Sequence, residues 1–186
     1  MEDHTEENFD DVSDITVLGD SLVRDLGKVM PRSKKTKSCV FTYPGAKIRN
    51  VKNRVNDFVE PEKNSFMVVN VGSNDVFQKH VASQDIVERY KELIGTLKDR
   101  RTNIVIIGIL PRLHENNFNL SRAIGINDKL SHLCREAKIS FIHPWLDFIS
   151  NKQYYKKDST HLRYNGTQHL ASLIIKQIHH HKQAFC

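Results

Sequence analysis

The sequence has few of the features that define several large protein classes. Its three cysteines are odd in number and lack the spacing of metal ligands, so neither a disulfide framework nor a zinc site is predicted. No apolar run approaches the ~18–20 residues of a membrane-spanning helix. The acidic N-terminus also lacks the basic and then apolar pattern of a signal peptide. Together these absences favour a cytoplasmic protein with reduced thiols.

Cofactor-binding motifs are missing as well. Neither a Gly-x-x-x-x-Gly-Lys loop nor a dinucleotide fingerprint follows the first predicted strand. The histidine run from His179 to His181 has no acidic or cysteine partner nearby, so a solvated helix end is favoured over a metal site. We therefore predict neither a cofactor nor a metal centre.

The charge is unevenly distributed, although the net charge is only +6. Basic residues dominate positions 24–54, where Asp25 is the single acidic residue. A solvated basic face is the simpler interpretation. The alternative is a surface that binds nucleic acid or an anionic membrane through Arg32, Lys34, Lys35 and Lys37.

A chain of 186 residues is long enough for one domain with a substantial core. Residues 1–13 are acidic and nearly free of large apolar side chains, which predicts a disordered tail. Residues 14–183 form the single predicted domain.

Strand and helix patterns alternate five times along this domain. The predicted strands are residues 15–18, 38–43, 66–71, 103–109 and 139–142. Phe41, in the second of them, is predicted to be a core residue. The predicted helices are residues 21–30, 46–59, 83–97, 120–137 and 165–182. Ile124 is predicted to lie on the apolar stripe of the fourth of these helices. Residues 72–75 are predicted as a turn, and residues 112–119 and 145–157 as irregular loops. The alternation predicts an α/β fold with a five-stranded parallel sheet and helices on both faces.

Polar residues follow the strands at the carboxyl edge of this sheet, where functional loops of parallel sheets gather. The loops after the first three strands carry Ser21, Gly45 and Asn74, and the loop before the last helix carries Asp158 and His161. Ester cleavage by a serine needs a base, a group that orients the base, and donors for an oxyanion. The pattern predicts Ser21 as nucleophile, His161 as base and Asp158 as its partner. The predicted oxyanion donors are the N–H groups of Ser21 and Gly45 and the amide of Asn74.

Each of these residues also has a simpler interpretation. Ser21 and Asn74 are common helix caps, and Gly45 and Asp158 are common turn residues. His161 is one of ten histidines and could lie at the surface without a partner. Residues 154–157, just before the predicted dyad, favour an exposed loop, with a substrate lid as the alternative.

The motifs together resemble a known family. The blocks Gly19-Asp20-Ser21, Gly45, residues 72–75 and residues 158–161 match in order and spacing those of the SGNH (GDSL-type) hydrolases. The resemblance implies a flavodoxin-like three-layer sandwich, a serine esterase mechanism and no metal. The family often has a glycine right after the catalytic aspartate, whereas this chain has Ser159.

The chain also resembles the esterase domain found in first-open-reading-frame proteins of some LINE retrotransposons. The supporting features are Val23-Arg24 after the serine, the basic stretch, and residues 158–166. This resemblance implies a module of a larger protein that acts on small acyl esters, and a lipid surface as a further partner.

Two functions therefore remain open from the sequence. The first is a serine esterase that hydrolyses short-chain, acetyl-type esters through an acyl-enzyme. The second is a non-catalytic module of the same fold that binds nucleic acid or anionic lipid through its basic stretch.

Overall fold

The computed structural model describes residues 14–32, 37–58, 65–78, 80–100 and 102–185. The predicted tail over residues 1–13, the side chains of Lys34 and Lys35, and the helix end predicted at Glu60-Pro61 lie outside the described residues.

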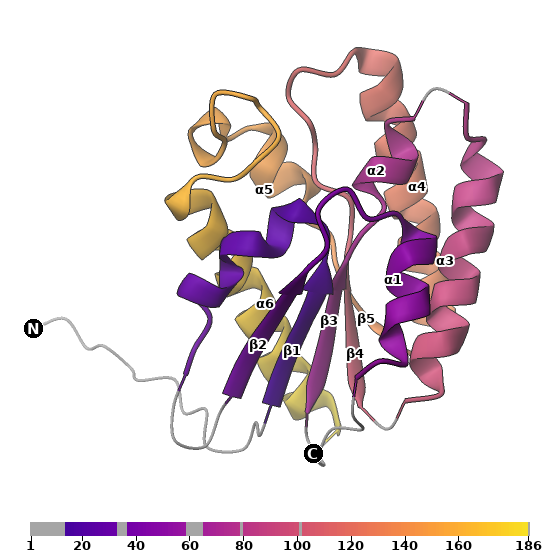
Figure 1. The fold of residues 1–186 in the computed structure, drawn as a ribbon, viewed down its shortest axis with the longest axis vertical. Coiled ribbons are helices and arrows are strands. Elements are labelled where there is room, and N and C mark those ends of the chain that lie inside the picture. The colour runs from indigo at the N-terminus through magenta and orange to yellow at the C-terminus, as the bar shows by residue number, and fades with distance from the viewer. Residues whose placement is uncertain (1–13, 33–36, 59–64, 79, 101, 186) are drawn as a thin grey trace, which may run out of the picture.

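The centre of the fold is a five-stranded parallel sheet with the order β2-β1-β3-β4-β5 (Figure 1). Its strands are β1 (Asp14–Gly19), β2 (Lys37–Thr42), β3 (Phe66–Asn70), β4 (Asn103–Ile107) and β5 (Ser140–Ile142). Every residue of β3 is buried, because this strand has neighbours on both sides and helices over both faces. The predicted α/β fold, with the strand order of the flavodoxin-like class, is confirmed.

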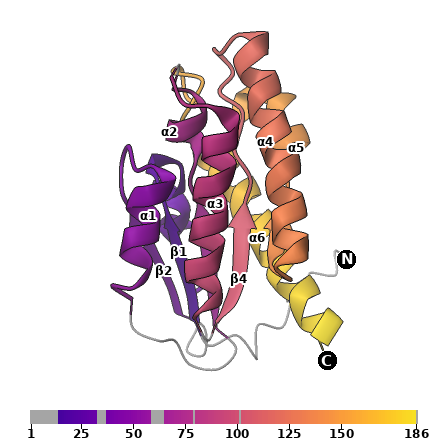
Figure 2. The ribbon, with the colours of Figure 1, turned by 90° about the vertical axis from the view of Figure 1, so that its right-hand side faces the viewer.

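Helices form a layer on each side of the sheet (Figures 1 and 2). The helical segments are η1 (Ser21–Lys28, a 3-10 helix), α1 (Ile48–Val55), α2 (Ser73–Val76), α3 (Ser83–Lys98), α4 (Asn117–Glu136), α5 (Trp145–Ile149), η2 (Lys152–Tyr154) and α6 (Tyr164–Phe185). One apolar core joins α1, α3 and α4 to the sheet through residues such as Ile48, Leu93 and Leu130. The other joins η1 and α6 to the opposite face through Leu26 and Leu170.

Two segments are more regular than the sequence predicted. Residues 72–75 were expected to form a turn, but α2 begins at Ser73. Gly72 permits this change of direction with a φ of 112°. A Cβ there would lie 1.9 Å from the hydroxyl oxygen of Tyr90, which donates a hydrogen bond to the carbonyl of Val71. The predicted irregular loop over residues 145–157 also contains a helix, α5, and the short η2.

Three burial predictions are wrong. Phe41 lies on the edge strand β2 and remains 40% exposed, although its ring contacts that of Phe58. Ile124, on α4, is 37% exposed and is not among the buried residues of that helix. Tyr155, predicted in an exposed loop, is buried, and its hydroxyl donates to the carbonyl of Pro111 at 3.0 Å.

Among the described helices, none combines the length and the apolar composition that crossing a bilayer requires. Cys39 and Cys134, the two cysteines within the described residues, are both free thiols. Cys134 is buried in the core, as predicted, and burial raises the pKa of its thiol to about 12.

Candidate active site

Ser21 lies where β1 changes directly into η1. The side chain that caps this helix belongs to Asp20, whose carboxylate accepts a hydrogen bond from the N–H of Leu22 at 2.9 Å. The alternative of Ser21 as the helix cap is therefore wrong. Its half-buried hydroxyl instead lies 3.0 Å from Nε2 of His161. Gly19 makes this turn possible, because a Cβ at that position would lie 2.4 Å from the carbonyl oxygen of Asn70.

The second ring nitrogen of His161, Nδ1, forms a hydrogen bond with the carboxylate of Asp158. The distance from Nδ1 of His161 to Oδ2 of Asp158 is 2.7 Å. A carboxylate beside Nδ1 favours the tautomer with its proton there, so that Nε2 can accept a hydrogen bond from the hydroxyl of Ser21. The serine, the histidine and the aspartate thus form one continuous hydrogen-bonded chain.

The backbone around Asp158 fixes its carboxylate. Oδ1 accepts hydrogen bonds from the N–H groups of Thr160 and His161 at 3.0 and 2.9 Å. Desolvation raises the pKa of Asp158, but these bonds and the ring of His161 outweigh it and lower the pKa to about 2. Ser159 has a φ of 57°, in the left-handed region that favours glycine. The serine at this position therefore keeps the loop geometry that a glycine would adopt more easily.

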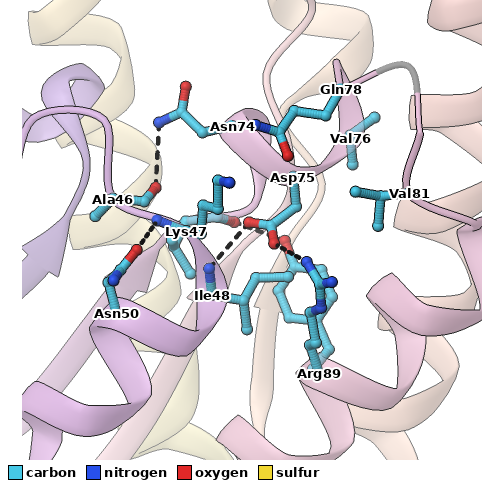
Figure 3. Close-up of polar contacts among 12 residues, drawn as sticks. Ala46, Lys47, Ile48, Asn50, Asn74, Asp75, Val76, Gln78, Val81 and Arg89 are labelled. Carbon is cyan, nitrogen blue, oxygen red and sulfur yellow. Dashed lines mark hydrogen bonds and ion pairs between the residues drawn. The ribbon is translucent and has the colours of Figure 1, made fainter.

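Asn74 contacts the residue that follows Gly45 and the residue that precedes Ser21. The amide nitrogen of Asn74 donates to the carbonyl of Ala46 at 3.1 Å (Figure 3). It also lies 3.5 Å from Oδ2 of Asp20, a long contact. Gly45 has a φ of 74° in the turn before Ala46. Asn74 is therefore linked to Ser21 through Asp20 and to Gly45 through Ala46.

Asp75 fixes the position of this turn relative to α2. Its buried carboxylate accepts hydrogen bonds from the N–H of Ile48 at 2.9 Å and from Nη1 of Arg89 at 2.8 Å (Figure 3). Because Ile48 is the first residue of α1, this bond ties the Gly45 turn to the segment that carries Asn74.

Arg112 fixes the orientation of the Asn74 amide. Nη2 of Arg112 donates to Oδ1 of Asn74 at 2.8 Å, and Nε donates to Oγ of Ser73 at 3.0 Å. The guanidinium also lies over the ring of Phe77, 4.8 Å from its centroid. With its oxygen held by a cation, the amide can direct only its nitrogen toward Ala46 and Asp20.

The sequence predicted five site residues, and the structure brings three of them into direct contact. Ser21, His161 and Asp158 are joined by hydrogen bonds, whereas Gly45 and Asn74 are connected to them through neighbours. A pocket of about 200 Å³ opens beside Ser21 and His161. Within the described residues, no cluster of three or more histidine, cysteine or acidic side chains has the arrangement of a metal site.

Comparison with known proteins identifies the fold. No protein-family model matches the sequence, and a search of curated proteins gives no significant match. Solved structures do match. A catalytic mutant of an acetylxylan esterase from Geobacillus stearothermophilus aligns over 89% of this chain and 94% of its own, with 15% identity and a TM-score of 0.72. A GDSL-like lipase from Bacteroides thetaiotaomicron aligns over 90% of this chain and 88% of its own, with 16% identity and a TM-score of 0.74.

This chain has the fold of the SGNH (GDSL-type) esterases. The family resemblance indicated by the sequence motifs is thus confirmed at the level of the fold. The esterase domain of the ORF1 protein of the zebrafish ZfL2-1 retrotransposon also matches, over 89% of this chain and 99% of its own, with 26% identity and a TM-score of 0.50.

Three polar residues of this SGNH fold were not found by reasoning from the sequence alone. Asp20 and Asp75 lie inside the matched motifs, but nothing in the sequence shows that both would be buried beside the site. Arg112 was predicted only as part of an irregular loop. Its position after a buried strand, at the carboxyl edge of the sheet, is the signal that could have identified it.

Asp20 is a buried aspartate whose pKa is well above the ordinary value for this side chain. Burial raises its pKa to about 6, and this effect outweighs the hydrogen bond from Leu22 and the charges of Arg112 and His161, which lower it. The folded state therefore holds a proton on Asp20 at pH values where the unfolded chain has released it. The ionised carboxylate costs stability in the SGNH fold but places a negative charge near His161 and Asn74.

Asp20→Asn is expected to change how stability depends on pH. Because the pKa of Asp20 is higher in the folded than in the unfolded chain, the wild type loses stability as the pH rises from about 4 to about 6. Asparagine does not titrate and can still cap η1. Relative to wild type, the variant should gain roughly 2–3 kcal/mol in the free energy of unfolding between pH 4 and 7. Urea unfolding at each pH measures this, and a difference that is constant over the range contradicts the assignment.

Proposed function

We propose that this protein is a serine esterase that hydrolyses short-chain, acetyl-type esters through an acyl-enzyme. The observation that carries the proposal is the hydrogen-bonded chain from Oγ of Ser21 to Nε2 of His161 and from Nδ1 of His161 to Asp158. A serine, a base and a carboxylate in this order are the parts that a nucleophilic hydroxyl requires.

In the first half of the reaction, Oγ of Ser21 attacks the ester carbonyl while Nε2 of His161 takes its proton. Asp158 stabilises the imidazolium that forms. The carbonyl oxygen becomes an oxyanion, for which we assign the N–H groups of Ser21 and Gly45 and one N–H of Asn74 as donors. The second N–H of Asn74 stays bonded to Ala46, which holds the amide in place.

The tetrahedral intermediate collapses when His161 returns its proton to the leaving alcohol oxygen and the bond between that oxygen and the carbonyl carbon breaks. A water molecule then attacks the acyl-enzyme, and His161 takes the proton of the water. The second tetrahedral intermediate collapses when the bond between Oγ of Ser21 and the carbonyl carbon breaks and His161 returns its proton to Oγ, which releases the carboxylic acid and restores Ser21. The two half-reactions use the same donors, and no redox step or further reactant is needed.

The solved structures that match this chain support a short acyl group in the substrate. Several matched structures are acetylxylan esterases, including the mutant from Geobacillus stearothermophilus and a second enzyme of this type. This likeness supports hydrolase chemistry of the same class.

A series of aryl esters tests the proposal. Acetate, butyrate, hexanoate and octanoate esters of one phenol keep the leaving group constant, and kcat/KM should fall as the acyl chain lengthens. An organophosphate should inactivate the enzyme and add its mass at Ser21, as read by peptide mass spectrometry. Absence of both hydrolysis and labelling in the folded protein overturns the esterase proposal.

Arg112→Lys is expected to lower kcat by about 10-fold with little change in KM. The planar guanidinium of Arg112 donates to Ser73 and Asn74 at the same time, and a lysine ammonium cannot reproduce this geometry. Arg49→Lys, at an exposed position on α1, is the matched control and should keep the wild-type kcat. If Arg112 acts by orienting the amide, added guanidinium ion should restore part of the activity of Arg112→Ala. A wild-type kcat in Arg112→Lys contradicts this role.

A second candidate function is suggested by the basic stretch and by the likeness to the retrotransposon ORF1 domain. Arg32 and Lys37 are exposed, and Lys34 and Lys35 lie between them outside the described residues. We propose that these residues allow a larger protein containing this module to bind nucleic acid or an anionic membrane surface. Such binding should weaken with salt, persist in Ser21→Ala, and fall when Lys34, Lys35 and Lys37 are neutralised.

A further inference from the structure

The pocket beside the reactive serine contains a cation that the proposed mechanism does not use. Ser21, Arg24, Lys156, Asp158 and His161 are among the residues that line it. Arg24 lies one turn along η1 from Ser21, so the position of its backbone is set by the same strand-to-helix turn.

The acidic side chains in this pocket already have partners, whereas one of its cations does not within the described residues. Asp158 is occupied by His161 and by two backbone N–H groups. Asp25 lies between Lys28 at 2.7 Å and Lys156 at 3.6 Å. Within the part of the chain that the structure describes, the side chain of Arg24 has no hydrogen-bond or ion-pair partner. Both carboxylates that line the pocket, Asp25 and Asp158, are thus bound by other groups, and the guanidinium of Arg24 remains available to a ligand.

The location of the pocket shows which part of an ester would meet these cations. Gly45 and Asn74, two of the three proposed oxyanion donors, do not line this pocket, although Ser21 does. It does contain His161, which returns the proton to the departing alcohol in the proposed mechanism. The alcohol part of the substrate, rather than its acyl part, therefore extends toward Arg24 and Lys156.

We propose that Arg24 and Lys156 form an anion subsite that selects esters whose leaving alcohol carries a phosphate group. This inference rests on the proposed esterase function and adds the substrate class. A guanidinium can bind two phosphate oxygens at once, and the ammonium of Lys156 adds a second positive charge. Lys156 can turn from Asp25 to the ligand because Lys28 keeps Asp25 paired.

The test compares two soluble esters that differ only in the anion, 1-acetylglycerol 3-phosphate and 1-acetylglycerol. The ratio of their kcat/KM values should favour the phosphate ester in the wild type. Arg24→Gln should lower that ratio by about 10-fold or more, the effect of losing a charge-assisted contact. Arg49→Gln removes the same charge from an exposed site on α1 and should leave the ratio unchanged, which separates a local contact from long-range attraction.

Binding of the product analogue, glycerol 3-phosphate, gives a readout that does not depend on catalysis. Titration by NMR should show binding to Ser21→Ala that is lost when Arg24→Gln is added. If binding behaves this way but no ester is hydrolysed, the esterase proposal fails and the anion subsite stands. If Arg24→Gln keeps the wild-type ratio, or if glycerol 3-phosphate does not bind, the anion subsite is overturned.

Discussion

Replacing Ser21 with alanine is expected to lower kcat/KM for an acetate ester by on the order of 10⁴-fold or more, because the acyl-enzyme can no longer form. The hydroxyl contributes one hydrogen bond, to Nε2 of His161, and does not cap η1. Its removal should therefore change the free energy of unfolding by less than about 1 kcal/mol. Initial rates with an aryl acetate, together with urea unfolding of the same preparation, measure both quantities.

Ser150→Ala is a matched control for this experiment, since Ser150 is an exposed serine at the end of α5. It should keep wild-type activity. Comparable hydrolysis by Ser21→Ala and wild type shows that the reaction occurs elsewhere and removes the basis of the proposed function. A loss of activity accompanied by unfolding is separated from a catalytic effect by the stability measurement.

Asp158→Asn should lower kcat by on the order of 10³–10⁴-fold through the tautomer of His161. Two backbone N–H groups bond Oδ1, so an asparagine would place its amide oxygen there and its NH2 group where Oδ2 now meets the ring. That NH2 group donates to Nδ1 and forces the ring proton onto Nε2. With its proton on Nε2, the ring cannot accept the proton of Ser21.

The paired substitution Asp128→Asn tests whether this effect is specific. Asp128 also lies beside a histidine, with Oδ1 3.8 Å from Nε2 of His143, but it is exposed on α4. Its replacement should not change kcat. Because the pKa of Asp158 is lowered to about 2, its carboxylate is ionised throughout the working range. An activity loss in the wild type between pH 4 and 6 that is absent from Asp158→Asn would assign that titration to Asp158 and contradict the lowered pKa.

The polar groups around the candidate site act as one network rather than as separate residues. Arg112 holds Asn74 and lies near the charge of Asp20, whose carboxylate caps the helix that carries Ser21. Asp75 ties the turn at Gly45 to the helix that carries Asn74. The effects of substitutions at two members on the free energy of unfolding should therefore not be additive. A double-mutant cycle between Arg112 and Asp20 can measure this coupling energy.

Much of the fold followed from local patterns. The apolar run that became β3 predicted a strand covered on both faces, and the spacing of Ile86, Tyr90, Leu93 and Leu97 predicted α3. Alternating elements with connections of this length leave few topologies, because crossovers between parallel strands are right-handed. The order of the motif residues along the chain then placed their loops at one edge of the sheet.

The sequence by itself thus determined the parallel sheet and the loops on which Ser21, Gly45, Asn74, Asp158 and His161 lie. Only the tertiary structure decided that Asp20 rather than Ser21 caps η1, that Arg112 orients Asn74, and that Arg24 lines the pocket beside Ser21. The physical reason is the range of the interactions. Strand and helix periodicity is set by neighbours along the chain, whereas the burial, charge and hydrogen bonding of a side chain depend on segments that only folding brings together.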